Sequence, residues 1–186
     1  MRPPAWYIGL VALVGAQRVR ELALSRRNER GVRGSRAAAR TYPLMVATHA
    51  CLCTLPLLEV ALRRRRRRPR APALWLGLLG AATALRWWSI RTLGASWNVR
   101  AVVPADLRPV ASGPYRFVRH PNYLAVALEF VALPMAGGAT WSAVGLSLLD
   151  ALVLADRIRE EERLLAAVPG YEEAFSGRAR LVPRVF

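Results

Sequence analysis

The segment from Gly113 to Tyr123, GPYRFVRHPNY, gathers groups that could do chemistry between two strongly apolar regions of the chain. Arg119, His120 and Tyr123 supply a cation, an imidazole and a phenol at close spacing. Two prolines in the segment fix their own backbone dihedral angles and push the preceding residues toward extended geometry. The segment therefore suits a loop that binds a ligand, although it could also be an ordinary entry into the next helix, with the second proline in the first turn.

A second polar group follows the last apolar region, in the sequence DRIREEERLL from Asp156 to Leu165. Arg157 and Glu161 are four residues apart and share one face of the expected helix. Taken alone, such a pair is a solvated surface ion pair worth about 0.3–0.5 kcal/mol. Pro169 and Gly170 end this helix, and a short helix is expected from 171 to 175.

Composition indicates a membrane protein of one domain. The chain has 186 residues, of which 54% are apolar and 22% are charged, so the charges belong in loops between apolar stretches. All 28 basic residues are arginine and the net charge is +16, which raises the possibility of a nucleic-acid-binding protein. The arginines flank apolar stretches, however, as in membrane proteins, so lipid headgroups are the expected partners and nucleic acid is not.

Apolar stretches predict an all-α integral membrane fold with about five transmembrane helices. Residues 1–92 would hold the N-terminal helices, and residues 93–186 the catalytic region with a cytoplasmic loop and a helical tail. The last long stretch is interrupted by LPMAGG from Leu133 to Gly138, which predicts a helical hairpin. The stretches are Pro4–Ala16, extending toward Leu24, then Tyr42–Leu62, Pro72–Ile90 and Asn122–Asp156.

The distribution of arginines predicts the orientation in a bacterial inner membrane. Most arginines fall in the loop after the first helix, in the segment from Arg86 to Arg119 and in the tail, so these parts are expected in the cytoplasm and the N-terminus outside. The run from Arg63 to Arg68 then lies on the outer face, which is unusual. No cleavable signal peptide is evident, so the first helix is expected to remain.

Metal and nucleotide motifs of the common kinds are not recognisable in the sequence. Cys51 and Cys53 have no partners elsewhere for a disulfide framework or a zinc site. His49 and Cys53 could share a helix face, but packing is the favoured interpretation over a metal pair. No glycine-rich dinucleotide fingerprint or phosphate loop occurs.

The order of these motifs resembles the isoprenylcysteine carboxyl methyltransferase family and its phospholipid methyltransferase relatives. The resemblance covers about Leu93 to the C-terminus. It rests on the loop GPYRFVRHPNY, the apolar hairpin, the spacing of Arg157 to Leu165, and the later Gly170, Tyr171 and Phe175. The first half is a weaker match and looks like the bacterial branch often found beside type III polyketide synthases.

The resemblance implies an enzyme that transfers a methyl group from S-adenosylmethionine, with no metal. Leu107 departs from the family, where carboxyl methyltransferases have histidine, and Arg100 stands in place of a glutamine. Arg157 matches the arginine on the substrate side. The implied cofactor contacts are Tyr115, Arg119, His120, Pro121, Tyr123, Glu161 and Glu162, with Arg100 and Val110 on the rim.

The chemistry of the acceptor decides whether a base is needed. A carboxylate or an acidic enol is ionised at neutral pH, so Arg157 could orient it without a base. A phenol or an amine needs one, and Glu129 is the candidate, although it could instead pair with Arg86 inside the bundle. Asp150 could likewise either act as the base or pair with an arginine inside the bundle.

Three functions remain open from sequence. The first is O-methylation of a lipophilic acceptor, either an alkylpyrone or alkylresorcinol polyketide or a prenylated carboxylate. The second is N-methylation of a phospholipid, and the third is non-catalytic binding of anionic lipid.

Overall fold

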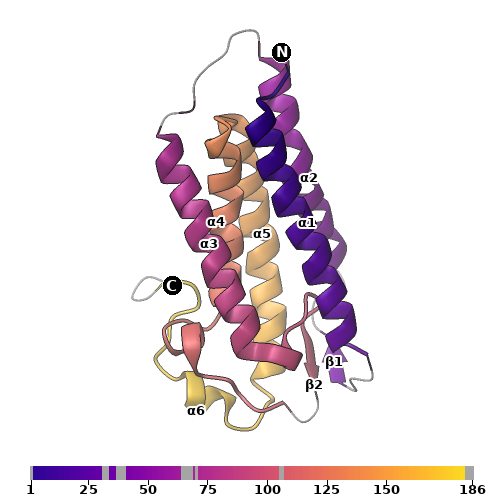
Figure 1. The fold of residues 1–186 in the computed structure, drawn as a ribbon. Helices are drawn as coiled ribbons and strands as arrows, with labels where there is room; N and C mark the ends of the chain where they lie inside the picture. The colour runs from indigo at the N-terminus through magenta and orange to yellow at the C-terminus, as the bar shows by residue number, and fades with distance from the viewer. Residues whose placement is uncertain are drawn as a thin grey trace.

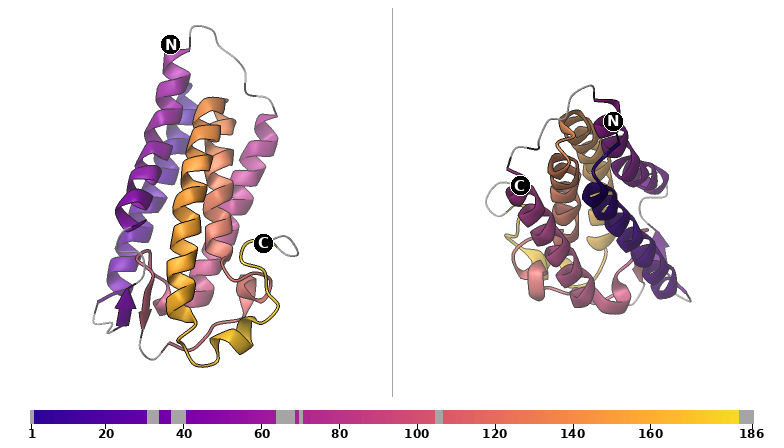
Figure 2. Two further views of the ribbon diagram at one scale, coloured as in Figure 1. Left: turned by 180° about the vertical axis from the view of Figure 1, so that it is seen from behind. Right: turned by 45° about the horizontal axis from the view of Figure 1, so that its top comes forward.

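Five long helices form an elongated bundle (Figures 1 and 2). The computed structural model describes residues 2–30, 34–36, 41–63, 69, 71–104 and 107–182. The predicted all-α bundle is confirmed. The long helices are α1 (Ala5–Asn28), α2 (Thr41–Leu62), α3 (Pro72–Leu93), α4 (Pro121–Ala136) and α5 (Thr140–Leu165).

Smaller elements gather at the end of the bundle opposite the turn between α4 and α5 (Figure 1). The sequence did not predict the antiparallel ribbon of β1 and β2, in which Ser35 lies opposite Val103. The expected short helix of the tail is present as α6. These elements are β1 (Gly34–Arg36), β2 (Val102–Pro104), the 3-10 helices η1 (Gly94–Ser96) and η2 (Gly113–Arg116), and α6 (Tyr171–Phe175).

The predicted hairpin is confirmed as α4 and α5, but its turn comes later than expected. Helix α4 continues through Pro134 to Ala136, and the chain reverses at Gly137 and Gly138. Gly138 has a positive φ of 73°, a conformation that glycine adopts without strain. The proline therefore lies inside the helix, and the glycines make the turn.

Helix α1 packs closely against this turn through Tyr7. The hydroxyl of Tyr7 donates a hydrogen bond to the carbonyl of Leu133 at 3.1 Å. A Cβ atom at Gly137 would lie 2.2 Å from the Tyr7 ring, so only glycine lets the ring approach this closely. The N-terminal half of α1 is thereby fixed on the hairpin.

The bundle combines several buried charges with large apolar side chains on its exterior. Glu21, Arg86, Glu129 and Asp150 are buried. A large apolar exterior combined with buried charges suits a bilayer rather than water. Large apolar side chains more than half exposed on the outer faces of the helices include Leu13, Val19, Leu58, Leu74, Leu148 and Leu152.

Membrane crossing is indicated most directly for α2. Within the described part of the chain, α2 is the helix that is long and apolar enough by itself to cross a bilayer, and only 17% of its apolar stretch is buried. Crossing by the other four helices, and the orientation of the bundle, stay predictions. The arginine run after Arg63 lies outside the described residues.

Glu59 near the end of α2 caps the start of α5. Its carboxylate accepts hydrogen bonds from the backbone N–H groups of Trp141 at 3.3 Å and Ser142 at 2.7 Å, and from the Ser142 hydroxyl at 2.7 Å. Ala139, at the cap position, provides no side-chain hydrogen bond. Glu59 therefore supplies, from a distant helix, the acceptor that the local sequence lacks.

Replacing Glu59 by alanine is expected to destabilise the fold by about 1–2 kcal/mol, because the first N–H groups of α5 lose their acceptor. Thermal unfolding in detergent micelles measures the change. Leu62→Ala is the control, because Leu62 lies on the same helix and is 73% exposed. Equal stability of the two variants would contradict a capping role for Glu59.

Candidate functional site

A cavity of about 330 Å³ lies at the end of the bundle that carries the small elements. Its lining comes from α1, α2, α3, the segment 96–110, η2, α4, α5 and α6. We distinguish two parts. The polar arm is lined by Asn98, Arg108, Tyr115, Arg119, His120, Glu161, Tyr171 and Phe175, and the apolar arm by Gly15, Leu22, Met45, Val46, Ala50, Cys53, Val126 and Leu154, with the charged side chains of Arg18, Glu21 and Arg86 also in the cavity lining.

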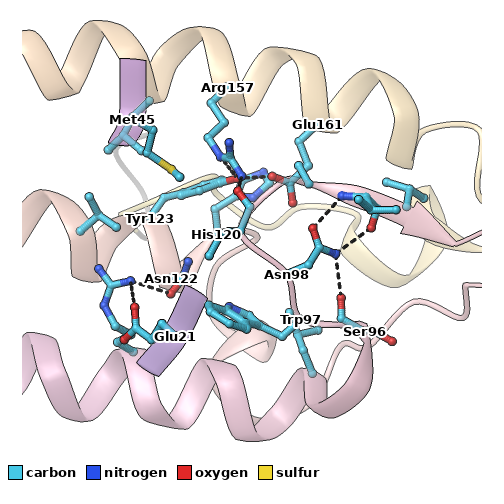
Figure 3. Close-up of a pocket in the computed structure, with 18 of the residues that line it drawn as sticks. Glu21, Met45, Ser96, Trp97, Asn98, His120, Asn122, Tyr123, Arg157 and Glu161 are labelled. Carbon is cyan, nitrogen blue, oxygen red and sulfur yellow. Dashed lines mark hydrogen bonds and ion pairs between the residues drawn. The ribbon is translucent and has the colours of Figure 1, made fainter. Parts of the chain in front are cut away.

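Arg157 and Tyr123 lie between the two arms, one helical turn from Leu154 and Val126 (Figure 3). Arg157 is 1% exposed, so the expectation of a solvated surface ion pair is wrong. Its Nε donates to the Tyr123 hydroxyl at 2.8 Å, and one of its Nη2 hydrogens goes to the carbonyl of Val99. The Tyr123 hydroxyl in turn donates to the carboxylate of Glu161.

One nitrogen of Arg157 is left over from this arrangement. Nη1 is buried and has no hydrogen-bond partner among the described residues. An unpaired charged donor is costly inside a protein unless a ligand uses it. Because Arg157 lines the cavity, Nη1 is the donor best suited to meet an anionic oxygen there.

His120 occupies the position just before α4 and pairs with the tail of α5. Its Nε2 lies 3.2 Å from Glu162 Oε1, while Arg180 Nε donates to Glu162 Oε2 at 2.9 Å. The resemblance implied one cofactor site for His120, Tyr123, Glu161 and Glu162. The structure pairs Tyr123 with Glu161 and His120 with Glu162. The hydrogen bond from His120, assisted by Arg180, holds the pKa of Glu162 below its usual value.

The C-terminal tail is tied to the loop that carries Arg119. The backbone N–H groups of Arg119 and His120 donate to the carbonyls of Ala179 and Arg180, each at 2.9 Å. The Arg119 side chain donates through Nε to the carbonyl of Arg178, also at 2.9 Å. The tail therefore packs against the loop that lines the polar arm.

Tyr115 enters the polar arm from η2. Burial raises the pKa of its hydroxyl, and the Glu161 carboxylate adds to this, so the ring stays neutral at physiological pH. Gly113 begins η2 with a φ of 57°, and a Cβ there would lie 2.5 Å from Oγ1 of Thr92. Glycine thus allows η2 to pack against α3.

The structure separates the predicted site residues into two sets. Pro121 is at the first position of α4 and shapes the loop from behind the cavity. Arg100 lies outside the lining, 3.7 Å from Glu29 and over the ring of Tyr42. Glu162 and Glu129 are also absent from the lining. The predicted residues that line the cavity are Tyr115, Arg119, His120, Tyr123, Glu161, Arg157 and Val110, joined by Leu107.

Sequence reasoning missed the segment that follows α3. Trp97 and Asn98 line the cavity (Figure 3). Asn98 closes a turn by accepting from the N–H of Val102 at 2.7 Å and donating to its carbonyl at 2.8 Å. The end of α1 holds this segment, since Asn28 donates to the carbonyl of Trp97 at 2.7 Å. The polar residues at the end of α1 were the signal in the sequence that could have pointed to this segment. The segment that they contact, however, is distant from α1 in the sequence.

Glu129 is part of a buried ion-pair network rather than of the cavity wall. Arg86 binds its carboxylate in a bidentate manner, with Nε at 3.1 Å and Nη2 at 2.8 Å, and Arg18 adds a contact at 3.2 Å. Glu21 completes the network by pairing with Arg18 at 2.8 Å. The structure therefore shows the pairing alternative that the sequence left open. Asp150 is also buried, and its Oδ1 has no partner within the described residues.

No group of three or more metal-ligating side chains occurs in the part of the chain that the structure describes. His49 and Cys53 both line the apolar arm. The His49 ring packs edge-on against Phe130, with ring centroids 5.1 Å apart.

Comparison with known proteins identifies the family. Residues 75–167, half of the chain, match the model of the isoprenylcysteine carboxyl methyltransferase (ICMT) family. The chain belongs to this family. The matched region runs from α3 to the end of α5 and contains Arg119, Tyr123, Arg157 and Glu161. The resemblance drawn from the motifs is thus confirmed, and the protein is a membrane-associated methylating enzyme.

One curated relative is similar over most of its length. The uncharacterized protein YpbQ of Bacillus subtilis strain 168 is 30% identical over 162 residues, which cover 84% of this chain and 94% of that protein. The similarity therefore includes the first half of the chain, where the sequence motifs are weaker. The association with type III polyketide synthases stays a prediction.

Replacing Glu129 by alanine is expected to destabilise the fold by roughly 3–5 kcal/mol, because the Arg86 charge stays buried without its main partner. Thermal unfolding in detergent micelles measures the loss. The double variant Arg86→Met with Glu129→Met removes both charges and is expected to be markedly more stable than Glu129→Ala. A double variant at least as unstable as the single one would contradict this role of the ion pair.

Proposed function

We propose that this protein is an S-adenosylmethionine-dependent methyltransferase that O-methylates a lipophilic acceptor at the cytoplasmic face of a bacterial inner membrane. The observation that carries the proposal is the unpaired, buried Nη1 of Arg157 between a polar and an apolar arm of one cavity. A cofactor on one side and a hydrophobic acceptor on the other would meet at this nitrogen.

The residues of the polar arm fit the proposed cofactor. S-adenosylmethionine has a doubly charged amino-acid head, a ribose diol and an adenine ring, and when bound it supplies an electrophilic methyl group. Arg119 and Glu161 offer charges of both signs, and Tyr115, Tyr171 and Phe175 offer aromatic faces. The cavity volume of about 330 Å³ lies within the range typical of ligand pockets.

The apolar arm supports a lipid-like acceptor. Val46 and Ala50 line the cavity and are also exposed on the outer surface of α2, while Gly15 and Leu22 line it from α1. This placement supports an opening of the cavity toward the bilayer between these two helices. We infer that a hydrophobic acceptor enters sideways from the membrane and presents its polar head to Arg157.

Positioning accounts for most of the catalysis in this mechanism. Arg157 is held by Tyr123 and by the Val99 carbonyl, so Nη1 has a fixed direction before the acceptor arrives. Nη1 would orient an anionic oxygen, and the apolar walls would exclude water from it. The enzyme needs no covalent nucleophile.

The charge of Arg157 also favours oxygen over nitrogen as the atom that is methylated. A guanidinium N–H attracts a carboxylate, phenolate or enolate oxygen and repels a protonated amine. We therefore prefer an alkylpyrone, an alkylresorcinol or a prenylated carboxylate as acceptor over a phospholipid amine. Labelled phosphatidylethanolamine products from membranes fed labelled cofactor would overturn this choice.

Arg157→Lys is expected to lower kcat/KM for methyl transfer by about 100-fold while cofactor affinity changes little, because lysine keeps the charge but loses the fork geometry.

Glu161→Ala is expected to abolish cofactor binding. Calorimetry with S-adenosylmethionine and assays with labelled cofactor measure the two effects. The control is Glu173→Gln, an exposed carboxylate on α6.

Unchanged cofactor affinity in Glu161→Ala would contradict the proposed polar arm. Full activity in Arg157→Lys would contradict the proposed role of Nη1. A wild-type protein that binds no S-adenosylmethionine would favour the non-catalytic alternative.

A further inference from the structure

The proposed reaction raises the question of which group takes the proton when the acceptor is a neutral hydroxyl. The carboxylates that line the cavity already have partners. Glu161 accepts from Tyr123, and Glu21 pairs with Arg18 at 2.8 Å and accepts from Gln17 at 3.1 Å. Glu129 does not line the cavity and is bound by Arg18 and Arg86, which do. None of these carboxylates is suited to receive a proton.

His49 has the properties that these carboxylates lack. It lines the apolar arm together with Met45 and Cys53, which lie one turn before and one turn after it on the same face of α2. In Figure 3, Met45 lies beside Tyr123 and Arg157 at the junction of the arms. His49 is thus on the acceptor side of the cavity, one turn deeper.

The tautomer of His49 follows from its backbone contact. Nδ1 lies 2.8 Å from the carbonyl of Met45, and a carbonyl can only accept, so Nδ1 carries the hydrogen. The lone pair of the neutral ring is then on Nε2. No hydrogen bond or ion pair of Nε2 is found in the described part of the chain, and the edge-on contact with Phe130 at 5.1 Å restrains the ring.

The other histidine of the cavity is less suited to this role. His120 Nε2 is 3.2 Å from the Glu162 carboxylate, which accepts from it, and the His120 backbone is tied to the tail. His120 also lies in the polar arm, where the cofactor is proposed to bind. His49 lies in the apolar arm, where the acceptor is proposed to bind.

We propose that His49 Nε2 is a catalytic base that removes the proton from the hydroxyl of the acceptor. This inference rests on the proposed function. The acceptor O–H bond breaks as its proton moves to Nε2, the oxygen forms a bond to the methyl carbon, and the bond from that carbon to the sulfonium sulfur breaks. The positive charge that the methyl donor would lose then resides on the His49 imidazolium, which later loses its proton to water.

The charges around His49 suit a ring that is protonated only transiently. Arg18 of α1 and Arg86 of α3 line the same cavity as His49, and Glu129 of α4 pairs with both arginines. The positive charges of the two arginines disfavour a protonated His49 in the resting enzyme. The negative charge of Glu129 stabilises the imidazolium that forms briefly during the reaction. The structure therefore points to weakly acidic hydroxyls, phenols or enols, as the acceptors that need His49, whereas a carboxylate would not.

The test compares His49→Asn with wild type in the full-length protein in lipid nanodiscs. Asparagine can keep a donor near the Met45 carbonyl but has no basic nitrogen. The probes are a long-chain alkylphenol and its nitro-substituted analogue, which is ionised at the assay pH. Thr54→Val is the matched control, because Thr54 is an exposed residue of α2 outside the cavity lining.

We expect His49→Asn to lower kcat/KM for the alkylphenol by about 100-fold or more and to change that for the ionised analogue by less than about threefold. The affinity for S-adenosylmethionine should not change. Equal losses on both probes, or no loss on either, would overturn the proposal.

Wild-type kinetics keep the proposal testable if the variant does not fold. With a base in place, the rate across a series of alkylphenols should depend only weakly on the acidity of the hydroxyl. Rates that follow the fraction of ionised phenol in solution would overturn the role of His49. If wild type binds S-adenosylmethionine but methylates no acceptor, both this inference and the proposed O-methylation fail.

Discussion

The chain of hydrogen bonds from Arg157 through Tyr123 to Glu161 links the parts of the molecule that form the cavity. Arg157 and Glu161 lie on α5, Tyr123 on α4, and the Val99 carbonyl on the segment after α3. A guanidinium that is 1% exposed must be compensated, and these partners accept from Nε and from one Nη2 hydrogen, whereas Nη1 has no partner among the described residues. The same burial that fixes the helices therefore leaves one directed donor in the cavity.

The second polar network, of Arg18, Glu21, Arg86 and Glu129, has a different role. It joins α1, α3 and α4 inside a bundle whose outer surface is apolar. In such surroundings the packing of apolar side chains provides little drive for association, whereas paired charges specify which helix faces meet. Arg18, Glu21 and Arg86 of this network also line the cavity, so helix association and the shape of the acceptor site depend on the same residues.

The sequence predicted the features that depend on local pattern. Apolar length gave the five helices and the hairpin, and the motif order brought Tyr123 and Glu161 together across that hairpin. The sequence could not predict contacts between distant residues. The burial of Arg157, the choice between the two roles left open for Glu129, the partner of His120 and the ribbon of β1 and β2 each depend on how remote segments meet. The role of Asn98 depends on a contact between its loop and α1, which is distant in the sequence. No spacing of residues in the sequence predicts that contact.

The proposed function requires that the polar arm bind S-adenosylmethionine next to Arg157. Photolabelling of the membrane-embedded protein with an azido-adenine analogue of S-adenosylmethionine, followed by mass spectrometry of the peptides, tests it most directly. If the cofactor binds in the polar arm, we expect the label to attach to η2, to the loop that carries His120, or to α6. Excess S-adenosylmethionine should then prevent labelling. Labelling only at the α4–α5 turn, or labelling that excess S-adenosylmethionine does not reduce, would contradict cofactor binding in the polar arm.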